Sequence, residues 1–226
     1  MKAETLGRVL VDIERKRPVV LATNLESGEQ RLLYRGDGET DRERADVERA
    51  LRVDVCVTTD EESGPQVFYQ PFNPPLRMIL VGAVHIAQPL SAMATLAGYE
   101  VTIADPRESF AADDRFPGVA LNLEWPDAAM ASLGLDQRCA IVTLTHDPKL
   151  DDPALHVALR SNAFFIGCLG SKKTHASRLR RLGKAGFDEA DLERVKGPVG
   201  LPIGSRSPAE IAVSVLAQIT QTLRKP

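Results

Sequence analysis

The chain has 226 residues, of which 43% are hydrophobic and 26% are charged, and its formal net charge is -3. This length suits one large domain or a medium domain with a smaller one, and the composition excludes wholesale disorder. The near balance of charge excludes a broad electrostatic attraction to nucleic acid or to acidic membranes, so any anion recognition must come from local clusters.

Residues 1–75 carry the pattern of a small α+β domain with a core that is marginal at this length. Apolar stretches at 18–25 and 29–35 flank a turn-like segment and predict a hairpin. A charged helix is expected over about 40–52, and a last strand over 66–72.

The proline-bearing stretch QPFNPPLR, residues 70–77, predicts a linker. Consecutive prolines continue neither a helix nor a central strand. We therefore expect two domains, the small one over 1–75 and a larger one over 76–226.

The larger domain alternates short apolar runs with stretches of helical spacing. This alternation predicts right-handed crossovers and a parallel sheet with helices on both faces. The fold class is therefore α/β, a Rossmann-like doubly wound parallel sheet with a small N-terminal α+β domain. The expected strands are 78–82, 100–105, 119–123, 140–145 and 163–170, and the expected helices between them include 87–98, 126–134 and 152–161.

The C-terminal helix has the clearest start signal in the chain. Ser207 is the expected N-cap, Pro208 occupies the first helical position, and Glu210 completes a capping box. Its apolar face suits packing on the sheet or on a second copy of the chain, so the sequence leaves open whether the chain forms a homodimer.

The three cysteines, Cys56, Cys139 and Cys168, are widely spaced and include no CxxC pair. This pattern predicts neither a disulfide framework nor a thiolate zinc site. For Cys168 a buried inert thiol is favoured over a sulfur-carrying role. Because no apolar run approaches the roughly 18 residues of a membrane span, we expect a soluble, cytoplasmic protein.

Four loops are expected to meet at the carboxyl edge of the predicted sheet, where ligands bind in open doubly wound sheets. Three of the four histidines lie in or beside these loops. The loops are GAVH at 82–85, DPR at 105–107, THDPK at 145–149 and GSKKTH at 170–175.

The first loop carries half of a dinucleotide-binding fingerprint. Gly82 suits the tight strand-to-helix turn, and Asp105 lies near the spacing at which an acid contacts a ribose. Val84 stands where a second glycine normally admits a pyrophosphate, which argues against ordinary NAD binding. At a helix start His85 is expected to be neutral, so it contacts a ligand without adding charge, or else caps the turn.

Gly170 and Ser171 lead from a predicted strand into a helix whose first turn bears Lys172 and Lys173. Free helix N–H groups, a hydroxyl and ammonium groups suit a phosphate. The alternative is a solvated basic surface that continues along this helix through Arg178, Arg180 and Arg181.

The stretch THDPKLDDPAL gathers polar residues at the end of another predicted strand. Thr145, His146 and Asp147 suit a base, a metal ligand or a ligand clamp, and the alternative is a hydrogen-bonded loop lock. Asp152 followed by Pro153 predicts a helix N-cap.

Several stretches, in this order, resemble one known family. They read GAVHIAQ, GYEVTIADPRESF, DRFPGV, LTHDPKLDDPAL, FFIGCLGSKKTHASRL and GPVGLPIGSRSPAEIAVSVLAQI. From residue 77 to its end the chain is similar to the XdhC/CoxI family of molybdoenzyme maturation factors. Where this family's turn often reads GAGH, Val84 narrows the pyrophosphate channel, which argues against dinucleotide forms of the ligand.

The resemblance implies a protein that binds molybdenum cofactor as cargo, supports its sulfuration with a cysteine desulfurase, and delivers it to the apoenzyme of a molybdenum hydroxylase such as xanthine dehydrogenase. It implies a binding and delivery protein more than a catalyst. The implied ligand contacts are Gly82, Val84, His85, Asp105, Arg107, Thr145, His146, Asp147, Gly170, Ser171, Lys172 and Lys173.

Two other function classes stay open on the residues alone. An NAD(P)-dependent oxidoreductase with a degenerate Rossmann turn would use Gly82 and Asp105. A metal hydrolase would draw on His85, His146 and Asp147, with His175 as a further candidate, but no HExxH-like spacing supports it, and we predict no resident metal.

Overall fold

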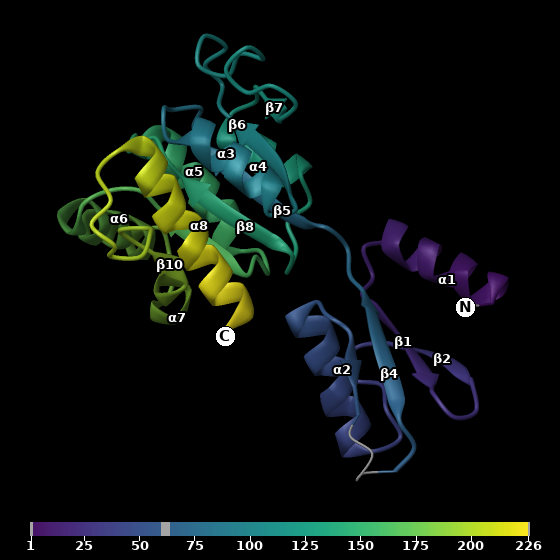
Figure 1. The fold of residues 1–226 in the computed structure, drawn as a ribbon. Coiled ribbons are helices and arrows are strands. Elements are labelled where there is room, and N and C mark those ends of the chain that lie inside the picture. Colours follow the sequence, from purple (N-terminus) through teal and green to yellow (C-terminus); the bar gives the residue numbers. More distant parts are fainter. Residues whose placement is uncertain (1, 60–63, 226) are drawn as a thin grey trace. The chain divides into compact units, whose positions relative to one another are not determined.

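The computed structural model describes residues 2–59 and 64–225. It divides into two compact units, Met1–Pro74 and Pro75–Pro226 (Figure 1). Within the described ranges, no helix combines the length and the hydropathy that a membrane span requires.

The N-terminal unit packs a helix on an antiparallel sheet of strand order β2-β1-β4-β3. The predicted hairpin, charged helix and last strand are confirmed, whereas helix α1 was not predicted. Val47, Ala50 and Leu51 of α2 pack on the sheet through Val20 and Tyr69. The elements are α1 (Ala3–Glu14), β1 (Val19–Asn24), β2 (Gln30–Leu33), α2 (Asp41–Val53), β3 (Val57–Thr58) and β4 (Val67–Phe72).

The predicted linker over 70–77 is wrong in its extent. Strand β4 continues through Pro71 to Phe72, and the next strand begins at Leu76. Strand β3 pairs with β4 only at Phe68 and Tyr69, so Pro71 lies beyond that pairing and its missing N–H is not needed on that side.

The C-terminal unit is the predicted doubly wound α/β fold. Over residues 75–225 its sheet has six strands in the order β10-β9-β8-β5-β6-β7, and every pairing is parallel. The strands are β5 (Leu76–Val81), β6 (Tyr99–Ala104), β7 (Ala120–Asn122), β8 (Cys139–Thr143), β9 (Phe165–Cys168) and β10 (Val195–Lys196).

Helices cover both faces of this sheet (Figure 1). Alternate residues of one strand serve opposite faces: Met78 and Leu80 pack with α3 and α8, whereas Ile79 and Val81 pack with α4, α5 and α6. The helices are α3 (Ala87–Leu96), α4 (Pro126–Ser132), α5 (Pro148–Leu159), α6 (Lys172–Lys184), α7 (Glu189–Glu193) and α8 (Pro208–Arg224).

The predicted N-cap at Asp152 is wrong. Helix α5 begins one Asp-Pro pair earlier, with Asp147 as N-cap and Pro148 in the first turn, and Pro153 lies inside the helix. Both Asp-Pro pairs carry the same local start signal. The earlier start buries Leu150 in addition to the later apolar residues, and that burial outweighs the hydrogen bond that Pro153 forfeits.

The C-terminal helix starts as predicted, with the complete capping box between Ser207 and Glu210. Ala212, Val215 and Ile219 are fully buried in the core beside α3, so α8 packs on the sheet of its own chain.

The two sides of α8 should therefore respond differently to truncation. We expect Ile219→Ala to lower the free energy of unfolding by about 2–5 kcal/mol, because a fully buried side chain leaves a cavity. Val213 lies on the same helix but is 46% exposed, so Val213→Ala should cost about 0.5 kcal/mol or less. Chemical denaturation measures both, and equal losses would contradict this packing.

Candidate functional site

Strand order puts the topological switch point of the sheet between β5 and β8, and in sheets of this kind the ligand crevice lies beyond the carboxyl ends of such strands. From β5 the chain proceeds outward to β6 and β7, and from β8 it proceeds outward to β9 and β10 on the other side. The loops after these two neighbouring strands leave in opposite directions, which is the arrangement at which open α/β sheets bind ligands.

Gly82 makes the tight turn after β5 and touches the loop after β8. Its φ is 109°, and a Cβ at this position would collide with Cγ2 of Thr145. The first and third predicted loops therefore meet in van der Waals contact. Val84 and His85 follow in the turn before α3, where Val84 is half-buried against the core and His85 is exposed.

Asp105 fastens this turn instead of projecting into the crevice. It is fully buried: its Oδ2 accepts from Ala83 N (2.8 Å) and Arg107 Nη2 (2.7 Å), and its Oδ1 accepts from Arg107 N (3.0 Å) and Nε (2.8 Å). Burial by itself raises the pKa of Asp105, but these hydrogen bonds outweigh burial and hold it below the usual value. With both oxygens engaged and shielded, the carboxylate is poorly placed for the ribose contact of a dinucleotide enzyme.

An arginine that the sequence analysis missed completes this side of the site. Arg115 donates from Nη1 to the carbonyl oxygens of Ala83 (3.0 Å) and Phe110. The guanidinium of Arg107 stacks on the ring of Phe110 at 4.2 Å, and its side chain is 38% exposed. Arg107 thus neutralises Asp105 while one edge of its guanidinium faces solvent. For Arg115, no local spacing in the sequence indicates that it binds these carbonyl oxygens.

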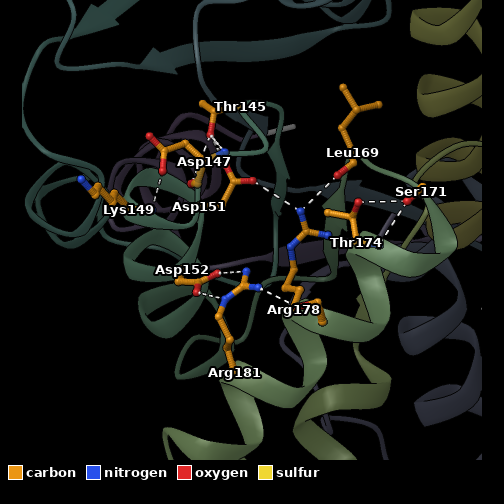
Figure 2. A network of polar contacts seen from close by, with 11 residues as sticks. Thr145, Asp147, Lys149, Asp151, Asp152, Leu169, Ser171, Thr174, Arg178 and Arg181 are labelled. Atoms are coloured by element: carbon orange, nitrogen blue, oxygen red, sulfur yellow. Dashed lines mark hydrogen bonds and ion pairs between the residues drawn. The ribbon is translucent and has the colours of Figure 1, made fainter.

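The loop after β8 is locked by its own hydrogen bonds (Figure 2). Thr145 Oγ1 donates to Asp151 Oδ1 at 2.6 Å and accepts from Asp147 N at 3.1 Å. The Asp147 carboxylate accepts from Lys149 N at 2.9 Å as the N-cap of α5. Asp147 therefore caps the helix, as in the loop-lock alternative, and the exposed polar side chains of this loop are His146, Asp147 and Lys149.

His146 lies against the loop after β9. Its backbone adopts a left-handed φ of 64°, and a Cβ added to Gly170 would lie 3.6 Å from its Nδ1. Gly170 itself has a φ of 144°. The third and fourth predicted loops therefore lie side by side, with room for little more than a methyl group between His146 and Gly170.

The loop after β9 leads directly into the first turn of α6. Ser171 is the N-cap and accepts from Thr174 N at 3.1 Å, and Lys172 and Lys173 are exposed on the first helical turn. This end of the helix combines unpaired backbone N–H groups, the positive end of the helix dipole and ammonium groups, all of which attract anions.

The basic surface considered as an alternative is interrupted along α6, where Arg180 is exposed as expected but Arg178 and Arg181 are engaged by carboxylates. Arg178 is 1% exposed and donates from Nη2 to Leu169 O (3.1 Å) and to Asp151 Oδ2 (3.4 Å). Arg181 pairs with Asp152 through contacts of 2.5 Å and 2.9 Å (Figure 2). Burial raises the pKa of Asp151, against the opposing influence of its hydrogen bond from Thr145 and the charge of Arg178.

Cys168 is fully buried on the α5 and α6 face of the sheet. Burial raises the pKa of its thiol to about 11, so the thiolate needed for sulfur chemistry is not populated at neutral pH. Burial also raises the pKa of Cys139. The preference for inert thiols over a sulfur-carrying role is consistent with this environment.

His175 lies in α6 behind the loop, not in the crevice with His146. Its ring packs on Gly197, where a Cβ would collide with the imidazole, and burial lowers its pKa. Within residues 2–59 and 64–225, no group of three or more histidine, cysteine or acidic side chains is arranged to hold a metal ion. The metal-hydrolase alternative therefore has no donor set in this part of the chain.

A fifth segment at the same edge was not assigned to the site from the sequence. In the loop after β10, Val199 N donates to Cys168 O at 3.0 Å. Gly200 packs closely on Ser214 of α8, because a Cβ at this position would collide with the Ser214 side chain. The parallel pairing of β10 with β9 brings this loop to the ligand edge. The segment GLPIGSRSPAE in the family resemblance was the available signal.

The contact between Gly82 and Thr145 can be tested against a matched glycine. Gly98 also has positive φ (88°) but open space around it, so Gly98→Ala should lose about 1–2 kcal/mol of unfolding free energy from backbone strain alone. Gly82→Ala should lose a further ~1–3 kcal/mol, because its methyl group collides with Thr145. Equal losses in urea denaturation would show that the loops are not in contact.

Comparisons with known proteins agree with this architecture. Residues 78–219 match the model of the XdhC Rossmann domain. The chain is 29% identical over 167 residues to the molybdenum cofactor insertion chaperone PaoD of Escherichia coli K12, covering 73% of this chain and 46% of that protein. It is 32% identical over 160 residues to a probable xanthine dehydrogenase subunit of Bacillus subtilis 168, covering 70% of this chain and 46% of that protein.

A crystal structure described as a xanthine dehydrogenase from Bacillus halodurans superposes with a TM-score of 0.73 at 24% identity, covering 98% of this chain and 67% of that one. This likeness shows a shared fold. The chain spans less than half the length of the two curated relatives. Since the family model matches most of the C-terminal unit, the chain belongs to the XdhC Rossmann domain family.

Proposed function

We propose that this chain binds molybdenum cofactor at the carboxyl edge of its parallel sheet and helps to insert the cofactor into a molybdenum hydroxylase of the xanthine dehydrogenase type. The observation that carries the proposal is the junction of three loops: Gly82 touches Thr145, and the loop after β8 is linked through Asp151 and Arg178 to Leu169, just before the start of α6. The family membership and the names of the relatives support the choice of ligand.

The α6 start is the proposed seat of the cofactor phosphate. Ser171, Lys172 and Lys173 are exposed there, and the buried guanidinium of Arg178 lies one turn below them. A phosphate would accept from helix N–H groups and offset the lysine charges, which are otherwise unfavourable next to the positive helix end.

The rest of the edge suits the pterin. His85, in the turn after Gly82, and His146, next to Thr145, have exposed imidazoles, and the partly exposed Arg107 adds a guanidinium. An imidazole offers a donor and an acceptor, which matches the alternating donors and acceptors of a pterin ring. Position 84 holds a branched residue in place of the glycine that lets a pyrophosphate approach the backbone closely, which favours the form of the cofactor that carries no nucleotide.

The proposed role is binding and delivery. Because the Cys168 thiol is buried and protonated, sulfur for the cofactor would come from a partner such as a cysteine desulfurase. That partnership, a cytoplasmic location and homodimerisation stay predictions from the sequence.

Copurification tests the ligand directly. We expect the chain purified from a cofactor-producing cell to yield a fluorescent pterin after oxidation, and the same chain from a cofactor-deficient cell to yield none. Protein from the producing cell that carries no pterin, and that fails to bind added cofactor, would overturn the proposal.

Charge substitution tests the phosphate seat. We expect the double variant Lys172→Ala with Lys173→Ala to bind the cofactor about tenfold or more weakly, a loss of about 1.4 kcal/mol or more in binding free energy. Lys184→Ala, at the opposite end of the same helix, removes a similar charge and should leave the affinity within about twofold. Titration by pterin fluorescence measures both, and equal effects would exclude this helix end as the seat.

The oxidoreductase alternative requires binding of a nicotinamide nucleotide, whereas the binding and delivery role does not. With the Asp105 carboxylate saturated by Arg107 and Ala83 N, we expect NADH and NADPH to show no binding at micromolar concentrations by calorimetry. Micromolar affinity for either nucleotide would favour the oxidoreductase over the delivery protein.

A further inference from the structure

Helices α5 and α6 are joined by carboxylate–guanidinium pairs at successive positions of α5. Asp152 pairs with Arg181 in a partly exposed bridge, with side chains 16% and 36% exposed. Asp151 pairs with Arg178 in a buried bridge, with side chains 2% and 1% exposed. Figure 2 shows both pairs side by side between the same helices.

The buried pair differs from its neighbour in what else it touches. Asp151 accepts from Thr145 Oγ1 in the loop after β8, and Arg178 donates to Leu169 O at the end of β9. The neighbouring pair stays within the helices, where Arg181 also donates to Ser177 of α6. Among the residues that the structure describes, it is therefore the buried pair that forms a continuous polar path from one proposed ligand loop to the other.

Stability alone does not account for a charge at position 178. Among the described residues, Arg178 Nε and Nη1 are buried without a hydrogen-bond partner, and the contact with Asp151 is long at 3.4 Å. Buried ion pairs of imperfect geometry are often replaced by apolar residues without loss of stability, because desolvation offsets their attraction. The pair's contacts to the two loops are its distinguishing feature.

We propose that Asp151 and Arg178 are positioning residues that couple the His146 loop to the Gly170 loop, so that both loops hold the ligand-binding conformation together. This inference rests on the proposed cofactor site for its functional meaning. The chain of contacts runs from Asp147 N to Thr145 Oγ1, to Asp151, to Arg178 and to Leu169 O. Displacing either loop removes a hydrogen bond from the buried pair, so the conformation of one loop is linked to that of the other.

The test uses an apolar replacement of the whole pair. Removal of Arg178 or Asp151 alone would leave a buried charge and would unfold the chain for a trivial reason. The double variant Asp151→Leu with Arg178→Met removes both charges and fills the buried site with apolar side chains, the larger Leu at 151 being offset in part by the smaller Met at 178. We expect it to unfold at nearly the same denaturant concentration as the wild type, while the loops lose their link.

Amide hydrogen exchange in the ligand-free protein reads the link itself. In the double variant we expect the amides of Asp147 and Thr174, which donate to Thr145 and Ser171, to exchange about tenfold or more faster than in the wild type. The matched control, Asp152→Leu with Arg181→Met, removes a pair between the same helices and should leave these rates within about twofold. Faster exchange at only one loop, or equal effects of the two double variants, would overturn the proposal.

Binding of the oxidised, phosphate-bearing pterin derived from the cofactor supplies the second readout. We expect about tenfold weaker binding for the Asp151 and Arg178 double variant at matched stability, and wild-type affinity for the control. If the wild type itself does not bind this pterin, the proposed function fails, while the exchange experiment still decides the coupling. If the wild type binds the pterin and the double variant shows wild-type exchange rates and wild-type affinity, the coupling is wrong and the proposed function stands.

Discussion

The parallel pairing of β5 with β8 is the constraint on which the rest of the C-terminal unit depends. Because these neighbouring strands point the same way and their chains leave in opposite directions, their following loops meet end to end. Gly82 can approach Thr145 only because it lacks a Cβ. If β5 and β8 were antiparallel, the loops that follow them would lie at opposite edges of the sheet and could not form one site.

The charged and polar groups around these loops differ in burial and in role. Asp105 and Asp151 are buried and accept hydrogen bonds from the backbone or side chains of adjoining loops, so they shape the crevice from behind. His85, His146 and the lysines of the α6 start stay exposed at its surface. The exposed surface carries the ammonium groups of the α6 start as well as the Asp147 carboxylate, whereas the buried acids beneath are hydrogen-bonded or paired, so the groups that attract an anion are concentrated at the α6 start.

Sequence periodicity was sufficient for the doubly wound fold, because alternation of strand and helix patterns leaves few topologies. Local sequence patterns gave wrong predictions where two segments carried the same helix-start pattern, or where the hydrogen-bond partner of a side chain lay far away in the sequence. The Asp-Pro pairs at 147 and 152 are equivalent caps, and only burial of Leu150 chooses between them. Arg178 looked solvated because its partners, Asp151 and Leu169, belong to other elements. The approach of the candidate loops followed from topology, while the inward role of Asp105 depended on Arg107 folding back on it.

The packing of α8 beside α3 has a consequence for biosynthesis. These helices lie far apart in the sequence yet share one apolar face of the sheet. During translation, the strip that Ala212, Val215 and Ile219 eventually cover stays bare until α8 has left the ribosome. Nascent chains therefore carry an uncovered apolar strip from the synthesis of α3 until that of α8, and this interval is when the C-terminal unit is most prone to aggregate.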